Sequence, residues 1–142
     1  SKIISKLNTP MMALGPIVSD ISAGFDHVAN AIGSSILAYN GGCNVINSIT
    51  REEHTGKVPS IESILEGIRA AKLSAHAVNI AKYNIYKKYT ESNIAALRAS
   101  KQSCVINDGL FEDLPRESVT KGCSRCGPHC PLILNKNIWS IE

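Results

Sequence analysis

The chain has 142 residues, of which 44% are apolar, 5% aromatic and 19% charged, and its formal net charge is +3. This length can bury about two-thirds of the unfolded surface in one domain, and the apolar content excludes an intrinsically disordered protein. No apolar run reaches the roughly 20 residues that span a bilayer, and no signal-peptide core is found, so we expect a cytoplasmic protein. The small charge and few aromatic residues give no indication of nucleic-acid binding.

The positions of Pro and Gly, together with apolar periodicity, predict a strand–helix–strand unit near the start of the chain. Residues 17–18 are a short β-prone step between loops that contain Pro and Gly. Residues 26–39 keep a helical apolar spacing with Asp26 as the expected N-cap, and the Asn-Gly-Gly sequence at 40–42 ends that helix. The Val- and Ile-rich run 43–49 predicts a buried strand. This order is typical of an α/β fold.

Two helices are expected to follow. Ser60 is the predicted N-cap of a long helix over residues 61–83, and a second helix is predicted over 91–103, so the pair suggests a helical hairpin or bundle. The long helix has one apolar stripe, made of Ile61, Ile64, Leu65, Ile68, Ala71, Ala75, Val78 and Ala81. The expected segments are residues 1–58 for the α/β part, 59–112 for the bundle and 113–142 for an irregular Cys-rich tail. Overall, the sequence predicts a helix-rich protein.

The tail contains a C-x2-C-x3-C string formed by Cys123, Cys126 and Cys130. Three thiolates within eight residues can converge on one inorganic centre, and the Gly-Pro pair at 127–128 provides the turn that brings the third sulfur round. A four-iron cluster with three protein ligands keeps one iron open for S-adenosylmethionine. Structural zinc, completed by His129 or a more distant His, fits the spacing equally well, and a pair of structural thiols fits it less well.

Several segments together resemble one family. They are residues 14–33, which contain Asp20 and Asp26, residues 53–59 around His54, residues 75–82, and the first part of the cysteine string. Their order and spacing are similar to those of the phosphomethylpyrimidine synthase (ThiC) family of thiamine biosynthesis. Jointly the segments are far more specific than any one of them alone.

The resemblance implies a radical S-adenosylmethionine lyase that converts aminoimidazole ribotide to hydroxymethylpyrimidine phosphate. The family folds as a (β/α)8 barrel followed by a helical bundle and a cluster-bearing tail, so the chain is expected to be the C-terminal α/β remnant of such a barrel with its bundle and tail. A homodimer is implied, in which the tail of one subunit closes the barrel of the other. Cys123, Cys126 and Cys130 match the ligands of the [4Fe-4S] cluster, and His54 matches one of two His that hold zinc.

The chain also departs from the family pattern. Three residues separate Cys126 from Cys130, whereas the family has four, and Met12 stands where the family has an active-site Tyr. The earlier three-quarters of the family's barrel has no counterpart here, and this absent portion includes the partner His of the zinc site. We therefore expect the isolated chain to be inactive.

Single residues outside the string have plain structural explanations beside the functional ones. Asp20 and Asp26 are both candidates for a substrate or second-shell contact. Asp20 is the better one because it has no evident structural task, whereas helix capping is the simpler explanation of Asp26. On sequence alone His54 is a solvated loop residue, and only the resemblance makes it a metal ligand. Cys43 and Cys104 are expected to be buried structural thiols.

Two other functions stay open. One is the related synthase that makes hydroxybenzimidazole from the same ribotide. The other is a non-catalytic module in which the cysteines bind zinc and the helices form a dimerisation surface.

Overall fold

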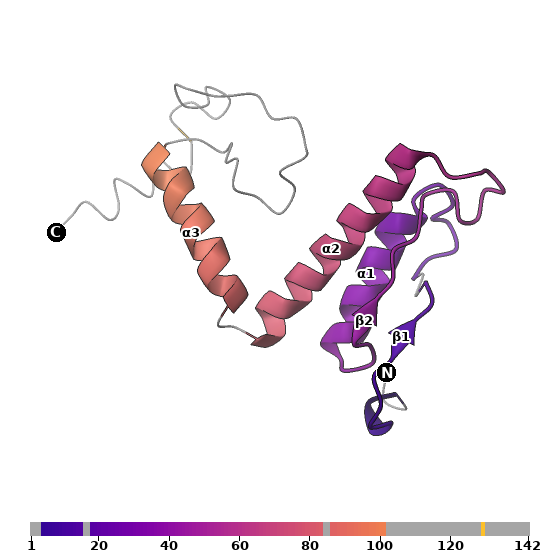
Figure 1. Cartoon of the computed structure of the whole chain (residues 1–142), viewed down its shortest axis with the longest axis horizontal. Coiled ribbons are helices and arrows are strands. Elements are labelled where there is room, and N and C mark those ends of the chain that lie inside the picture. The colour runs from indigo at the N-terminus through magenta and orange to yellow at the C-terminus, as the bar shows by residue number, and fades with distance from the viewer. Residues whose placement is uncertain (1–3, 16–17, 84–85, 102–128, 130–142) are drawn as a thin grey trace. The chain divides into compact units, whose positions relative to one another are not determined.

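The computed structural model describes residues 4–15, 18–83, 86–101 and 129. The chain divides into two units, Ser1–Ile85 and Tyr86–Glu142 (Figure 1). The first unit contains, in order, a 3₁₀ turn η1 (Ile4–Lys6), strand β1 (Met12–Ala13), helix α1 (Asp26–Tyr39), strand β2 (Val45–Ile46) and helix α2 (Ile61–Tyr83). The second unit contains helix α3 (Tyr86–Lys101), which begins five residues earlier than the sequence predicts. Because the helical hairpin joins the two units, it stays a prediction.

The two strands pair in parallel, with Met12 opposite Val45 and Ala13 opposite Ile46. Asn44 extends the pairing by one residue, because its backbone N–H donates to the Met11 carbonyl at 2.8 Å and its side-chain Oδ1 accepts from the Met11 N–H at 3.0 Å. Helix α1 lies between the strands in the sequence, so the predicted strand–helix–strand order is confirmed for this part of the chain. The prediction of a buried strand over residues 43–49 was wrong in extent, since β2 has only Val45 and Ile46, and Val45 is 51% exposed.

The position of the first strand was predicted wrongly. Val18 belongs to no strand, and the strand lies at Met12–Ala13 instead. The cause is the local pairing: Asn44 holds Met11 beside β2, and the backbone then turns at Gly15, whose φ is 51°. Residues 16 and 17 are outside the described ranges.

Helix α1 has the bounds that the periodicity predicts, and glycine ends it. Gly41 has a φ of 74°, its N–H donates to the Ala38 carbonyl at 3.1 Å, and the Gly42 N–H donates to the Leu37 carbonyl at 2.9 Å. This is a Schellman ending, in which glycine takes the left-handed conformation at little cost. The chain then enters β2 through Cys43, a buried thiol that donates to the Val45 carbonyl, as expected for a structural cysteine.

Helix α2 also has its predicted bounds, and Ser60 caps it. The Ser60 Oγ accepts a hydrogen bond from the Ser63 N–H at 3.2 Å, which satisfies one of the backbone donors that the first turn leaves free.

We expect Ser60→Ala to lower the free energy of unfolding by about 1 kcal/mol, because the Ser63 N–H loses its acceptor. Urea denaturation measures the change. Ser92→Ala, at an exposed position of α3, is the control and should change the value by no more than about 0.5 kcal/mol. An equal effect of both substitutions would show that Ser60 contributes nothing as a cap.

Helices α1 and α2 lie side by side in the first unit (Figure 1). Besides Asp26, the buried residues of the two helices are Ala29, Asn30, Gly33, Ser34 and Ala38 of α1 and Ser63, Gly67, Ser74 and Val78 of α2. The Ser74 Oγ lies 3.0 Å from the Ala31 carbonyl and 2.9 Å from the Ser35 Oγ. Ser74 thus bonds α2 to α1, and Val78, one residue of the predicted apolar stripe, joins Ala38 of α1 in the small buried core.

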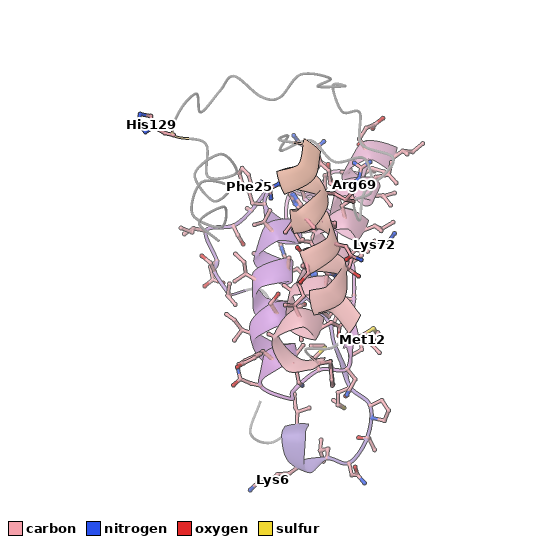
Figure 2. All side chains as sticks on the ribbon, turned by 90° about the vertical axis from the view of Figure 1, so that its left-hand side faces the viewer. Lys6, Met12, Phe25, Arg69, Lys72 and His129 are labelled. Carbon is pink, nitrogen blue, oxygen red and sulfur yellow. The ribbon has the colours of Figure 1, made fainter. Side chains whose placement is uncertain are left out.

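The larger apolar side chains of both helices are left at the surface. On α1, Val28, Ile32, Ile36 and Tyr39 are between 42% and 58% exposed. Ile61, in the predicted apolar stripe of α2, is 74% exposed, and Phe25 just before α1 is exposed as well (Figure 2). Exposed apolar faces of this kind mark surfaces that another segment or subunit covers. Among the helices that the structure describes, none is long and apolar enough to cross a membrane.

Candidate functional site

Two loops that carry predicted site residues follow the two parallel strands. The loop after β1 contains Asp20 and enters α1 at Asp26, and the loop after β2 contains His54 and enters α2. Parallel strands end at the same edge of their sheet, which is where α/β proteins keep their ligand sites. Figure 1 shows the β2–α2 loop and the first turn of α1 at the same end of the strand–helix–strand unit.

A contact between Asp26 and His54 joins these loops. The Asp26 Oδ1 lies 2.8 Å from the His54 Nδ1, although the residues are 28 positions apart in the sequence. The Asp26 side chain is 1% exposed, whereas the His54 side chain is 57% exposed. The carboxylate is thus enclosed by protein, and the imidazole presents much of its ring to the outside.

The other oxygen of the same carboxylate is bonded as well. The Gly24 N–H donates to the Asp26 Oδ2 at 3.4 Å, within the loop that follows β1. Asp26 therefore accepts a hydrogen bond from each loop, one on each oxygen.

Asp26 is the first member of a buried polar row on α1. Asn30 and Ser34 follow at four-residue intervals, and both are 1% exposed. The Asn30 Nδ2 donates to the Asn47 carbonyl at 3.0 Å, and the Ser34 Oγ donates to the Asn30 Oδ1 at 3.3 Å. Because residues four apart lie on one helix face, the row holds α1 against the backbone that leaves β2 and so positions the His54 loop.

The expectation that Asp26 is the N-cap of α1 was wrong. Asp26 is the first helical residue, Phe25 occupies the N-cap position, and no side chain there accepts a cap hydrogen bond. The reason is that both oxygens of Asp26 are already engaged by His54 and Gly24. Its negative charge in the first turn still complements the positive end of the helix dipole.

Burial by itself raises the pKa of the Asp26 carboxyl. The hydrogen bonds from His54 and from the Gly24 N–H, together with attraction to His54, outweigh burial, so the pKa lies below its ordinary value of 3.8. At neutral pH the carboxylate is therefore ionised and can only accept hydrogen bonds.

This shift predicts a pH dependence of stability. A folded-state pKa below the unfolded value contributes stability that is present above pH 3.8 and is lost as the pH falls through the folded pKa. We expect the stability advantage of the wild type over Asp26→Asn, measured by urea denaturation, to shrink as the pH is lowered below 3.8. Asp20→Asn is the control for the loss of one negative charge from the segment before α1. A wild-type advantage that grew in acid would contradict the sign of the shift.

Arg51 also anchors the loop that contains His54. The Arg51 Nε lies 3.1 Å from the Glu52 Oε1, and its Nη1 lies 3.2 Å from the Glu66 Oε2 on α2. The Thr55 N–H and its side-chain hydroxyl both donate to the Glu52 carbonyl at 2.9 Å. The segment before α2 is therefore a series of hydrogen-bonded turns that presents His54.

The other predicted site residues are not brought to this contact. Asp20 is exposed in a turn, and among the residues that the structure describes it has no hydrogen-bond or ion-pair partner. Met12 lies on β1 and is 56% exposed (Figure 2).

Cys123, Cys126 and Cys130, like Cys104, lie outside the described ranges. Within the described part of the chain, no three His, Cys, Asp or Glu side chains gather as a metal-binding group.

Comparison with known proteins gives a consistent result. A model described as the Radical SAM ThiC family matches residues 2–137. The phosphomethylpyrimidine synthase of Pyrococcus abyssi is 40% identical over 131 residues, which cover 88% of this chain and 30% of that protein. The synthase of Thermococcus gammatolerans is 38% identical over 133 residues (89% and 31%), and that of Thermococcus kodakarensis is 35% identical over 143 residues (95% and 32%). The chain thus spans about a third of the length of these curated relatives.

Proposed function

The chain belongs to the radical SAM ThiC family, and from this premise we propose that it forms the C-terminal part of a phosphomethylpyrimidine synthase of thiamine biosynthesis. The observation that carries the proposal is the family match over residues 2–137, which takes in both the His54 loop and the complete cysteine string. The relatives named above carry the same enzyme name.

The proposed reaction is a radical carbon–carbon lyase conversion of aminoimidazole ribotide to hydroxymethylpyrimidine phosphate. Cys123, Cys126 and Cys130 would hold a [4Fe-4S] cluster as thiolates, with S-adenosylmethionine at the iron that has no cysteine. When bound, such a cluster supplies the single electron that cleaves S-adenosylmethionine. The three soft sulfur donors and their short spacing support this ligand set.

We further propose that His54 binds zinc near the active site. The imidazole suits zinc because its side chain is 57% exposed and its Nδ1 is already bonded to a buried carboxylate, an arrangement common for zinc-ligating His. A full set of ligands would have to include groups other than the described residues, since no group of three forms among those described.

The proposed setting is the last part of a (β/α)8 barrel in a cytoplasmic homodimer. The parallel pairing of β1 with β2 around α1 supports the barrel, because barrels are built from such units. The exposed apolar residues of α1, Val28, Ile32, Ile36 and Tyr39, support a larger assembly that covers them.

A chimera tests the enzyme proposal. The matched third of the Pyrococcus abyssi synthase is replaced by this chain, and deoxyadenosine and the pyrimidine phosphate are measured anaerobically with the ribotide, S-adenosylmethionine and a reductant. We expect both products from the chimera and neither from the chain alone. A folded, iron-loaded chimera that released no deoxyadenosine would contradict the proposal.

A second candidate is a non-catalytic zinc-binding and dimerisation module. It is favoured by the three-residue spacing between Cys126 and Cys130 and by Met12 in place of the family's Tyr. Metal content separates it from the enzyme, since the module would hold zinc on the cysteines and take up no iron.

A further inference from the structure

Asp26 connects the two loops at the strand ends through a single buried carboxylate. Its Oδ1 lies 2.8 Å from the His54 Nδ1, and its Oδ2 accepts the Gly24 N–H at 3.4 Å. The side chain is 1% exposed, so water has almost no access to either oxygen. A carboxylate held in this way has little freedom to rotate away from the imidazole.

The chemistry of the pair determines the proton position on the imidazole. An ionised carboxylate has no proton to donate, so the 2.8 Å contact requires a proton on the His54 Nδ1. In the neutral ring the lone pair then belongs to Nε2. Nε2 is the only nitrogen left for a ligand, and the side chain as a whole is 57% exposed.

The helix does not need this aspartate as a cap. Phe25 occupies the N-cap position, and Asp26 accepts no hydrogen bond from the first turn of α1. Asp20, six residues earlier, is exposed, and in the described part of the chain it makes no hydrogen bond or ion pair. Both hydrogen bonds of the buried Asp26 carboxylate therefore connect the two loops and do not cap the helix.

We propose that Asp26 is a positioning residue for His54, which fixes the Nδ1-protonated tautomer and the ring orientation so that Nε2 is free to bind a divalent metal ion. The proposal rests on the metal-ligand role of His54 in the proposed function. It adds the residue that prepares the ligand and identifies the nitrogen that binds. Partners of this type typically change metal affinity by about 10- to 100-fold when they are removed.

The test uses the full chain labelled with ¹⁵N, and reads the two ring nitrogens of His54 by long-range ¹H–¹⁵N correlation at neutral pH. His54→Gln identifies its signals. In the wild type we expect Nδ1 to be protonated and Nε2 to be unprotonated. A neutral ring whose proton lies on Nε2 instead of Nδ1 would overturn the proposal, and this measurement needs no destabilised variant.

Asp26→Asn and Asp20→Asn then form a matched pair, since each removes one negative charge from the same loop. The amide introduced by Asp26→Asn has one acceptor oxygen for two donors, so we expect the His54 tautomer to become mixed or to reverse, while Asp20→Asn keeps the wild-type signals. Signals that are unchanged in a folded Asp26→Asn variant would overturn the proposal.

Zinc added to the chimera with the Pyrococcus abyssi synthase, in which the other zinc ligands are supplied, gives a separate result. We expect Nε2 to shift and Nδ1 to stay protonated, and zinc on Nδ1 would overturn the proposal. If His54 did not respond to zinc while its Nδ1 stayed protonated, the metal role within the proposed function would fail and the tautomer assignment would be supported. The two failures are thus distinguishable.

Discussion

Gly67→Ala is expected to lower the free energy of unfolding by about 2 kcal/mol, although alanine is the better helix former. A Cβ on Gly67 would clash with the Ile49 carbonyl oxygen and would come within 3.2 Å of the Ser48 Oγ. Overpacking of this kind costs about 1–3 kcal/mol or more, while the gain in helix propensity is at most about 1 kcal/mol. The clash involves backbone, which cannot rotate away as a side chain does. The clash therefore outweighs the gain in helix propensity, and the free energy of unfolding falls.

The effect of Gly67→Ala should extend to the site, because Ile49 leads into the His54 loop. Urea denaturation measures the stability, and the His54 ring signals report the loop. Ala81→Gly, on the exposed side of α2, is the control and should lose only the propensity difference of about 1 kcal/mol. A Gly67→Ala variant more stable than the wild type would show that α2 does not pack this closely on the segment after β2.

Cys126→Ser is expected to abolish cluster binding and, in the chimera, to reduce deoxyadenosine formation to the level of the iron-free protein. A serine hydroxyl is a poor substitute for a thiolate, and a site with only three protein ligands has none to spare. The absorbance of the anaerobically reconstituted protein and the deoxyadenosine yield measure the two effects.

Cys104→Ser is the matched control for Cys126→Ser, since it removes a thiol outside the string. It should leave both the absorbance and the yield unchanged. Equal losses in the two variants would contradict the assignment of the cluster to the string, as would full iron retention by Cys126→Ser.

The helices were predictable because their signals are local. Ser60, the apolar spacing and Asn40-Gly41-Gly42 act within a few residues, and α1 and α2 have the predicted bounds. Strand β1 was not predictable in position, because it has only two residues and its place depends on Asn44, 33 positions from its partner Met11. A local propensity for β structure at residues 17–18 carries no information about that pairing.

The packing face of the helices was also missed. Apolar periodicity locates Ile64, Leu65 and Ile68, but these residues are exposed, whereas Ser74 bonds to α1 and Gly67 packs against the Ile49 backbone. Small residues at spacings of four and seven, namely Ser63, Gly67 and Ser74, are the signal that could have identified the buried face of α2.

The residues of the candidate site were predictable from the sequence, but the contact between Asp26 and His54 was not. Sequence reasoning placed Asp26 and His54 in loops after strands, and parallel pairing brings such loops to one edge. It explained Asp26 as a cap, because a local explanation was available and a partner 28 residues away gives no local signal. Asn30, which holds the same loop, was missed for the same reason.

The iron and sulfide content of the full chain after anaerobic reconstitution tests most directly whether the three cysteines hold an iron–sulfur cluster. We predict about four iron and four sulfide per chain, with an absorbance that changes when S-adenosylmethionine is added. A chain that instead retains one zinc ion, takes up no iron, and loses that zinc in Cys126→Ser would contradict the proposed enzyme and establish the zinc-binding module.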